Sequence, residues 1–520
     1  MERITINKLR KIYDNLISKS PRPKYYHYLK YNYLNLSIQF SRDEREFDID
    51  NYKLLKNLNY QVKETFNIFS KKHNFISGYK KYLLSFKEQN YIPNKNLPIL
   101  FILDILKHLN QIFDIVGIAL IISFSAIITS LKKSNKEEIK LDNKKIYSIY
   151  YWKGKSSNSS IYYYPSINSS KSNKAFISSF ADSRYFSKGL IHSLFNSNFL
   201  SPAKILNIKD LILSILQFIH LFIYDIYLVI FKKDFHFLSI WIGWKKGAEI
   251  FYSILIYNSM IKLVKKSSRC EFISWHENQI TNRSFSLGVS FARKIYFSSC
   301  SLSTFNGTLF TKQAKRQFLP LKSELLIGFW GEKYYLQDEG SMKEMKSFLK
   351  EENLDISLKV SPKSMLRVRE FPSDIKSNSN KLRDITIFSH ASYWDLIGCL
   401  LSIFNHKNKS ISYQRRLIVK HEKLYIRLHP SLNKEDALSE IKRIKEIPNY
   451  INYEFIGLSE ESLITSIKSS KNCLFGISSY VNIAIKLGSK VFAVETSHIY
   501  KSPIKFELIN SPNLTKLSPW

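Results

Sequence analysis

Cysteine is scarce in this chain. Only 4 of its 520 residues are cysteines, namely Cys270, Cys300, Cys399 and Cys473, and no two of them have CxxC spacing. A disulfide framework needs an even set of closely spaced cysteines, and a zinc site needs paired ligands. The sequence therefore predicts neither, and its cysteine content is typical of a protein in a reducing cytosol.

Several common catalytic motifs are also missing. The sequence contains no P-loop, no GxGxxG after a strand, no HExxH and no GxSxG. The letters DxD occur at Asp48-Ile49-Asp50, where no Rossmann strand is predicted nearby. No metal-bound diphosphate site is expected, so a metal-independent mechanism is favoured, with leaving-group charge handled by His429, helix N-termini and cations such as Arg427 or Lys420.

Acidic residues are few relative to basic ones. Lys and Arg number 78 against 43 Asp and Glu, which gives a net charge of +35. Such a charge favours anionic partners. The lysines are, however, scattered among Asn, Ile, Ser and Tyr, without an arginine-rich block or an RNA-binding signature. We therefore expect no specific nucleic-acid partner.

Long apolar runs are limited to two segments. Residues 115–131 carry no charge, and residues 211–231 are interrupted only by His220 and Asp225. Both are close to the minimum of about 17–25 residues for crossing a bilayer. Lysine pairs follow them, at Lys132-Lys133 and Lys232-Lys233. Buried helices, or helices lying in the membrane interface, are both compatible with this pattern.

The N-terminus lacks the continuous apolar stretch of a secretory signal, so export is not expected. Together with the two apolar segments, this predicts a cytoplasmic protein with peripheral contact at the cytoplasmic face of the inner membrane.

The length predicts at least two domains, because one domain usually takes about 100–200 residues. Hydrophobic residues make up 44% of the chain, which is enough for real cores. We predict a helical accessory region over 1–95, a Rossmann-like acceptor domain over 96–332 with apolar helices 112–131 and 211–231, an interdomain connection over 333–380, and a Rossmann-like nucleotide-binding domain over 381–520.

Alternating strand and helix patterns support this division. The first half has strand patterns at 145–152, 175–180 and 270–275, with a helix pattern over 244–265. The second half has strand patterns at 384–389, 424–428, 453–456, 473–477 and 490–494, separated by helix patterns at 393–404, 435–445, 459–468 and 481–486. Strand and helix in alternation predict parallel α/β sheets.

The clearest candidate site lies at the end of a strand that contains Arg427 and finishes at His429-Pro430. Ile426 and Leu428 should share one face of this strand and Arg427 the other, and Pro430 prevents its continuation. An imidazole at a strand's carboxyl end can donate a hydrogen bond to a phosphate oxygen. A histidine that only caps a turn fits the same pattern.

A second candidate is the small-residue turn containing Gly476, Ser478 and Ser479, which separates a strand from a helix. Backbone N–H groups and hydroxyls in such a turn can bind an anion. An ordinary N-cap is the alternative. Because this turn and His429 follow strands of one predicted sheet, both can reach the same crevice.

These two segments carry a resemblance. The sequence reads RLHP and then GISSYVNIAIKLGSKVFAV, and residues 384–495 resemble the nucleotide-binding domain of GT-B glycosyltransferases of the His-Pro group, which includes bacterial polysialyltransferases and related capsule and lipopolysaccharide enzymes. The resemblance implies two Rossmann-like domains facing a cleft. It also implies that His429 contacts the donor phosphate and that Ser478 and Ser479 bind the nucleotide. Ile483, beside Asn482, replaces the ribose-binding Glu of many GT-B enzymes, which puts activity in question.

The third candidate follows the strand pattern at 270–275. It is similar to the ENQ segment of surface-carbohydrate biosynthesis proteins, in which a carboxylate and amides face the cleft. An inverting transferase needs a base for the acceptor hydroxyl. The candidate bases are, in order, Glu277, His276 and Asp182, with Asn278, Gln279 and Asn282 as further cleft residues. A helix start with Glu and Asn in dipole-favoured or capping positions is an equal alternative.

The sequence thus predicts a glycosyltransferase that moves a sugar from a CMP- or UDP-linked donor to a surface glycan, such as capsule, O-antigen or a lipid-linked acceptor, without a cofactor. Three alternatives remain: a polyol-phosphate transferase of the teichoic-acid type, a noncatalytic member of a surface-carbohydrate assembly complex, and a basic nucleic-acid-binding protein.

Overall fold

The computed structural model describes the main helices and strands from residue 97 to residue 517. The described residues are 97–131, 143–151, 173–180, 186–196, 198–227, 230–231, 241, 244, 247–267, 269–275, 280–305, 331–336, 339–351, 357–360, 382–389, 393–429, 432–442, 444–457, 461–476, 478, 480–494, 504 and 508–517. The predicted accessory region 1–95 lies outside these residues.

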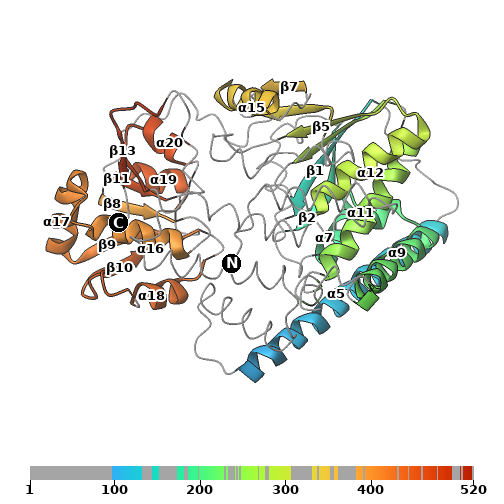
Figure 1. The fold of residues 1–520 in the computed structure, drawn as a ribbon, viewed down its shortest axis with the longest axis horizontal. Helices are drawn as coiled ribbons and strands as arrows, with labels where there is room; N and C mark the ends of the chain where they lie inside the picture. The colour runs from blue at the N-terminus through green and yellow to red at the C-terminus, as the bar shows by residue number, and fades with distance from the viewer. Residues whose placement is uncertain are drawn as a thin grey trace. The chain divides into compact units, whose positions relative to one another are not determined.

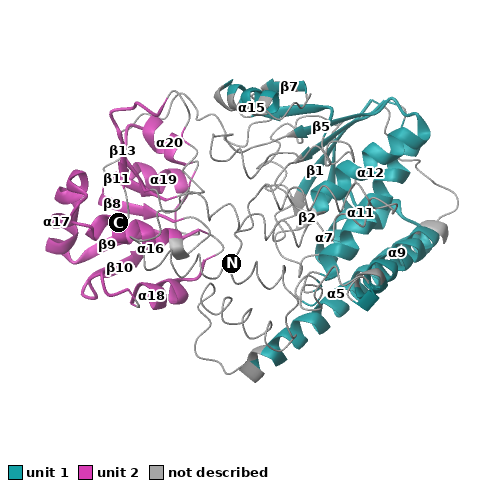
Figure 2. Cartoon of the chain, viewed as in Figure 1, with its two compact units in different colours: residues 1–42, 57–307, 318–369 teal, residues 43–56, 308–317, 370–520 magenta. Residues whose placement is uncertain are grey.

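The chain divides into two compact units (Figure 2). The first contains the described residues from 97 to 360, and the second those from 382 to 517. Each has its own parallel sheet and its own hydrophobic core. The prediction of two Rossmann-like units is confirmed by these sheets.

The first unit contains a seven-stranded sheet in the order β3-β2-β1-β4-β5-β6-β7, and every neighbouring pair is parallel (Figure 1). Its strands are β1 (Lys145–Tyr151), β2 (Asn173–Phe180), β3 (Phe199–Leu200), β4 (Glu271–Trp275), β5 (Ser301–Phe305), β6 (Lys333–Leu336) and β7 (Ser357–Val360). The chain changes direction across the sheet between β1 and β4, which is the switch point of a doubly wound fold.

Among the described helices of the first unit, α11 (Gly247–Lys265) is a central one, and most of its residues are buried. A helix that is apolar all round belongs inside a domain. The others are α5 (Leu97–Leu131), α7 (Phe186–Phe195), α8 (Pro202–Ile205), α9 (Ile208–Tyr227), α12 (Ile280–Tyr296) and α15 (Glu339–Glu351). Helix α11 contacts α5, α8, α9 and α12, so it connects the sheet-covering helix α12 with the outer pair α5 and α9.

The second unit contains a six-stranded parallel sheet in the order β10-β9-β8-β11-β12-β13. Its strands are β8 (Arg383–Phe388), β9 (Lys423–Arg427), β10 (Asn452–Phe455), β11 (Ser470–Phe475), β12 (Lys490–Val494) and β13 (Leu514–Leu517). Its helices are α16 (Tyr393–Phe404), η7 (Lys409–Ile411), α17 (Ser412–His421), α18 (Lys434–Lys442), α19 (Leu463–Lys468) and α20 (Val481–Lys486). The switch point lies between β8 and β11.

The predicted end of the first domain, at residue 332, is too early. Residues 333–360 supply β6, α15 and β7 to the first sheet rather than connecting the two domains. The sequence pattern of this segment resembles that of a linker, because its helix is charged and its strands, β6 and β7, are only four residues long. The first unit therefore extends to β7.

Helix α19 starts later than its pattern suggested. The helix pattern at 459–468 predicted a start at Ser459, but α19 begins at Leu463, and its N-cap is Ser462, whose side chain accepts a hydrogen bond from the Thr465 backbone N–H. Two serines precede the helix, and only the contact with the N–H at N3 identifies the cap.

Candidate functional site

The carboxyl edge of the second sheet brings together the residues predicted to bind a donor. Strands β9 and β11 both pair with β8, so their ends flank it on one edge. Adjacent strands are about 4.8 Å apart, which places the ends of β9 and β11 roughly 10 Å from each other. His429 follows β9, and Gly476 and Ser478 follow β11. The predicted pair therefore shares one edge at the switch point.

An apolar floor lies directly beneath this edge. Phe388, the last residue of β8, pairs with Phe475, the last residue of β11. Their rings stack with centroids 4.7 Å apart, and both side chains are buried. Buried apolar side chains lower the local dielectric, which strengthens the interactions of nearby polar groups.

His429 has the position predicted for it. It is half-buried, and its backbone N–H donates a hydrogen bond to Ser389 Oγ at 3.1 Å. The backbone N–H of Ser389 in turn donates to the Arg427 carbonyl at 3.1 Å. These two bonds extend the pairing of β8 and β9 past the last residues of the strands. They fix the main chain at His429 relative to the end of β8. Pro430 lies outside the described residues.

Gly476 permits a close approach of the Asp395 side chain, which sequence inspection did not find. A Cβ atom built on this glycine would lie 2.0 Å from Oδ1 of Asp395. Asp395 is in the first turn of α16, which follows β8, and only 2% of it is exposed. A carboxylate in the first turn of a helix is stabilised by the helix dipole. The ends of β8 and β11 thus meet through Asp395 and Gly476.

Ser478 forms a turn ahead of α20. Its Oγ accepts a hydrogen bond from the Tyr480 backbone N–H at 3.2 Å, and the side chain is half-buried. This is the local hydroxyl-to-backbone bonding that favours serine in turns. Ser479 lies outside the described residues.

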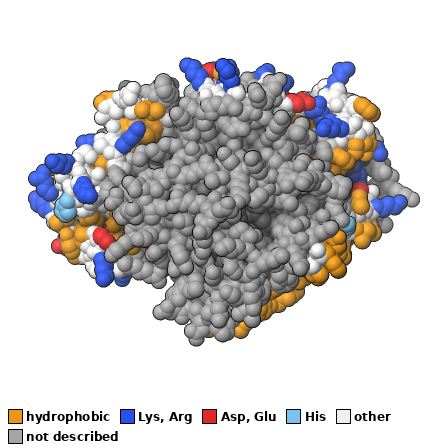
Figure 3. All heavy atoms as spheres, viewed as in Figure 1, with side chains coloured by type: hydrophobic (Ala, Val, Ile, Leu, Met, Phe, Trp, Pro, Cys, Tyr) orange, Lys and Arg blue, Asp and Glu red, His pale blue; other side chains and the backbone are white. Residues whose placement is uncertain are grey.

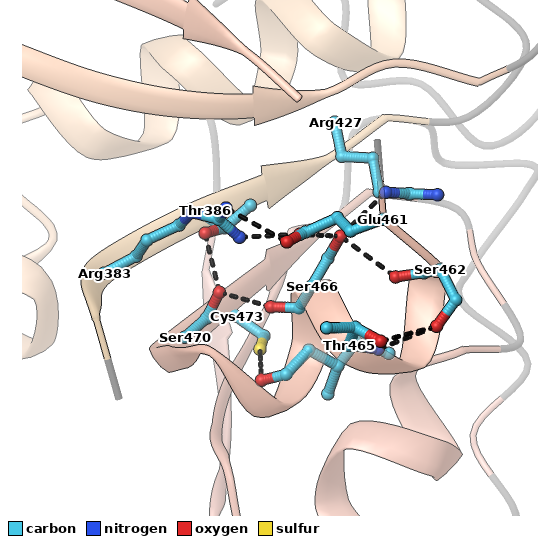
Figure 4. Close-up of polar contacts among 10 residues, drawn as sticks. Arg383, Thr386, Arg427, Glu461, Ser462, Thr465, Ser466, Ser470 and Cys473 are labelled. Atoms are coloured by element: carbon cyan, nitrogen blue, oxygen red, sulfur yellow. Dashed lines mark hydrogen bonds and ion pairs between the residues drawn. The ribbon is translucent and has the colours of Figure 1, made fainter. Parts of the chain in front are cut away.

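Arg427 lies on the predicted face of β9, opposite the buried Ile426, and is itself only 6% exposed. Its Nη1 donates to Ser466 Oγ at 2.7 Å, and this hydroxyl also bonds to Glu461 (Figure 4). Glu461 is paired with Arg383 through two hydrogen bonds of 2.7 and 3.2 Å. The guanidinium of Arg427 thus belongs to a polar network that joins β8 and β9 to α19.

Charges in this network move the pKa values of its members. Burial raises the pKa of Glu461, but hydrogen bonds from Arg383 and Ser466 and the charges of Arg383 and Arg427 together hold it below its usual value. Burial lowers the pKa of Arg427, with Glu461 acting in the opposite direction. The lowered pKa keeps Glu461 ionised at neutral pH, so it forms an ion pair with Arg383.

Ile483 is a core residue of α20, with 5% of its surface exposed. Its neighbour Asn482 is also buried, at 6%. A glutamate at position 483 would therefore lose its hydration, so the packing of this helix is suited to the isoleucine.

In the first unit, the described part of the third candidate site is Asn282, in the first turn of α12. Its Oδ1 accepts hydrogen bonds from Ser178 at 2.9 Å and Ser148 at 3.2 Å, on β2 and β1. Ser274, on β4, donates to its carbonyl at 3.5 Å. The residue is 3% exposed, and its Nδ2 is buried without a hydrogen-bond partner. Asn282 therefore fixes the start of α12 against three strands.

The other predicted residues of this site, which are Asp182, His276, Glu277, Asn278 and Gln279, lie outside the described residues. Among the described residues, no group of three or more His, Cys, Asp or Glu side chains could hold a metal ion. Sequence inspection missed Ser389 and Asp395. Two signals could have identified them: Ser389 directly follows a strand, and Asp395 lies in the first turn of the next helix.

No family model and no curated protein matches the chain. Several solved structures resemble it weakly, and three of them are described here. A UDP-N-acetylglucosamine 2-epimerase is 10% identical with a TM-score of 0.36, covering 72% of this chain and 83% of that one. An S. aureus MnaA–UDP co-structure is 12% identical with a TM-score of 0.35, covering 67% and 79%. An alpha,alpha-trehalose-phosphate synthase (UDP-forming) from Burkholderia vietnamiensis is 7% identical with a TM-score of 0.28, covering 48% and 62%. TM-scores under 0.5 assign neither fold nor activity to the chain.

Proposed function

We propose that the second unit binds the phosphates of a nucleotide sugar at the carboxyl edge of β8, β9 and β11. The observation that supports this most directly is the position of His429 and of Gly476 with Ser478 on either side of β8 at the switch point. Ligands of open parallel sheets bind in this crevice. A spacing of roughly 10 Å between the two flanking strands suits a diphosphate with its ribose.

The proposed reaction is transfer of the sugar to a glycan acceptor. His429 donates a hydrogen bond to the leaving phosphate, where negative charge develops, and the turn at Ser478 and Ser479 binds the nucleotide. Glu277 is the proposed base for the acceptor hydroxyl, ahead of His276 and Asp182. The proposed donor is UDP- or CMP-linked, the acceptor is a surface polysaccharide, and the mechanism uses no metal or cofactor.

A noncatalytic role is the second candidate, and the burial of Ile483 favours it. An isoleucine in the interior of α20 provides no carboxylate for the ribose hydroxyls. Nucleotide binding without sugar transfer or donor hydrolysis would support this role. Turnover of nucleotide-activated glycerol in place of a nucleotide sugar would support a polyol-phosphate transferase.

Calorimetric titration of the whole chain with UDP and with CMP tests the binding site. We expect binding of one of these nucleotides, and the change His429→Ala should weaken it by about tenfold or more. A hydrogen bond to a charged group contributes about 1.5–3 kcal/mol, and about 1.4 kcal/mol corresponds to a factor of ten in affinity.

His421→Ala is the matched control. His421 is exposed and lies just before β9, so it belongs to the opposite edge of the same sheet. Its removal should leave the affinity unchanged. The proposed site would be contradicted if neither UDP nor CMP bound, or if both variants lost the same amount of affinity.

A further inference from the structure

Helices α5 and α9 expose a large apolar surface on the first unit. The two helices contact each other and both pack on α11. On α5 the exposed side chains include Ile102, Ile112, Phe113, Leu120 and Phe124, and Phe113 is 74% exposed. Figure 3 shows apolar side chains along the edge where Figure 1 draws these helices.

Helix α9 continues the same surface. Ile212, Leu216 and Ile223 are each at least half exposed, whereas Leu211 and Leu221 on the other side of the helix are buried in the core. A helix of 35 residues is about 52 Å long, so the paired helices form an apolar strip rather than isolated exposed residues. Apolar surfaces of this extent mark binding to a membrane or to another protein. We name this strip the α5–α9 face.

The opposite side of α5 is attached to the first unit along much of its length. His108 Nε2 is 2.9 Å from the Trp241 carbonyl, Gln111 Oε1 accepts from the Ala248 N–H at 3.1 Å, and Ser125 Oγ donates to the Ala203 carbonyl at 2.6 Å. The first and last of these contacts are 17 residues apart, which is roughly 25 Å along the helix.

By length and composition, Phe101–Ile128 is the one segment of the described chain that passes as a membrane span. A span surrounded by lipid would leave the polar contacts of His108, Gln111 and Ser125 without partners or would carry the sheet of this unit into hydrocarbon, both of which are costly. Attachment on one side and exposure on the other instead fit a helix that lies in the membrane interface.

Charge is distributed unequally between the two sides. The acidic residues of α5 are turned inward: Asp104 is 4% exposed, and Asp114 has a buried Oδ2. On α9, Asp210 is paired with Lys262 of α11. The exposed charges described on these helices are Lys107 and Lys209. This side therefore combines apolar side chains with positive charge.

In the sequence, the pairs Lys132-Lys133 and Lys232-Lys233 follow shortly after the two helices. Each lysine near an anionic membrane surface adds about 1 kcal/mol of attraction. A second copy of the chain would bring like charges together in an isologous pair, which disfavours that occupant.

We propose that the α5–α9 face binds an anionic lipid bilayer, with its isoleucine, leucine and phenylalanine side chains in the boundary between headgroups and acyl chains. This deepens the peripheral membrane contact expected from the sequence by naming the surface and the lipid charge. It requires no nucleotide, so vesicle binding and UDP binding are separate readouts and either can fail without the other.

The test is sedimentation of the full chain with vesicles, either of phosphatidylcholine alone or of three parts phosphatidylcholine to one part phosphatidylglycerol. We expect the wild type to bind the anionic vesicles, and more weakly at high salt. The double variant Phe113→Glu, Leu120→Glu should reduce this binding by at least tenfold, since it places two carboxylates in the acyl boundary. Both positions are exposed, and unchanged circular dichroism would verify the fold.

The matched control is Tyr413→Glu. Tyr413 is 60% exposed on helix α17 of the second unit, close to the 64% of Leu120, and its substitution should leave vesicle binding unchanged. Equal binding by the double variant would overturn the proposal, as would absence of wild-type binding to anionic vesicles. If the chain were recovered only in detergent, α5 would be a spanning helix. If the chain self-associated without binding vesicles, and the double variant abolished this self-association, the occupant would be a second copy. Either result overturns the proposal.

Discussion

At the scale of single residues, the candidate site depends on a glycine and a carboxylate that lie far apart in the chain. Gly476 was expected to belong to a small-residue turn that can bind an anion. In the structure it has a steric role, because the carboxylate of Asp395 occupies the space that a side chain would need. The position of Asp395 in turn depends on α16, which starts at the carboxyl end of β8. The geometry of the proposed phosphate site is therefore set by a pair of residues, not by a motif.

Gly476→Ala should destabilise the second unit by about 1–3 kcal/mol, the usual cost of overpacking a closely packed site. The added methyl would lie 2.0 Å from Asp395 Oδ1, and Asp395 is too buried to move freely. Urea unfolding measures the effect. Gly247→Ala is the control, because the nearest atom to its Cβ would be 3.7 Å away. A smaller loss for Gly476→Ala when combined with Asp395→Ala would assign the clash to this carboxylate, whereas equal stability of Gly476→Ala and wild type would refute it.

At the scale of elements, short segments are held by hydrogen bonds to main-chain carbonyls. Lys204 on α8 donates to the carbonyl of Asn196 at 2.6 Å and to that of Phe199 at 3.0 Å, which fixes the turn between α7 and β3. Burial, followed by the nearby charge of Lys174, lowers the pKa of Lys204 to about 8. A neutral amine still has two N–H donors, so both hydrogen bonds survive deprotonation.

This pKa makes the stability of the first unit depend on pH. The folded value of about 8 lies below the ordinary 10.5, so between these values the unfolded chain binds more protons. The free energy of unfolding must then rise with pH across this window. Below the window, the contribution of Lys204 must not change with pH. We expect the unfolding free energy of wild type, minus that of Lys204→Met, to increase from pH 8 to pH 10 in urea titrations. A difference that is constant over this range would show that Lys204 titrates normally.

At the scale of the whole molecule, the chain contains two separate cores. Phe251, on α11, is fully buried in the core of the first unit, and Leu400, on α16, is fully buried in that of the second. Residues 333–360 belong to the first sheet, so the second unit begins later in the chain than a linker at 333 would suggest. Units with their own cores are the usual basis for independent unfolding.

Calorimetry of the whole chain should therefore show two unfolding transitions. Phe251→Ala should lower one of them, with a cost of about 3–5 kcal/mol, and Leu400→Ala should lower only the other, at about 2–5 kcal/mol. Each variant serves as the control for the other. A single transition that shifts with both substitutions would mean that the two units unfold as one.

The local elements follow from the residue pattern, because helix and strand patterns depend on residues a few positions apart. The sequence predicted the helices at 393–404 and 481–486 and the strand at 490–494 with the bounds observed, and it placed His429 at the end of a strand that in the structure ends two residues earlier, at Arg427. It missed helix α17. It also missed strand β13 and assigned β6 and β7 to a linker, because short strands carry too little alternation to be recognised.

Which of these elements meet depends on the packing of the whole fold. Strand order brought Asp395 against Gly476 and joined Asn282 to Ser148 and Ser178, which are 134 and 104 residues away in the chain. Packing of α5 on α11 also decided which side of that apolar helix is exposed. Such contacts form between distant segments, and their geometry follows from the packing of whole sheets and helices, which no local pattern encodes.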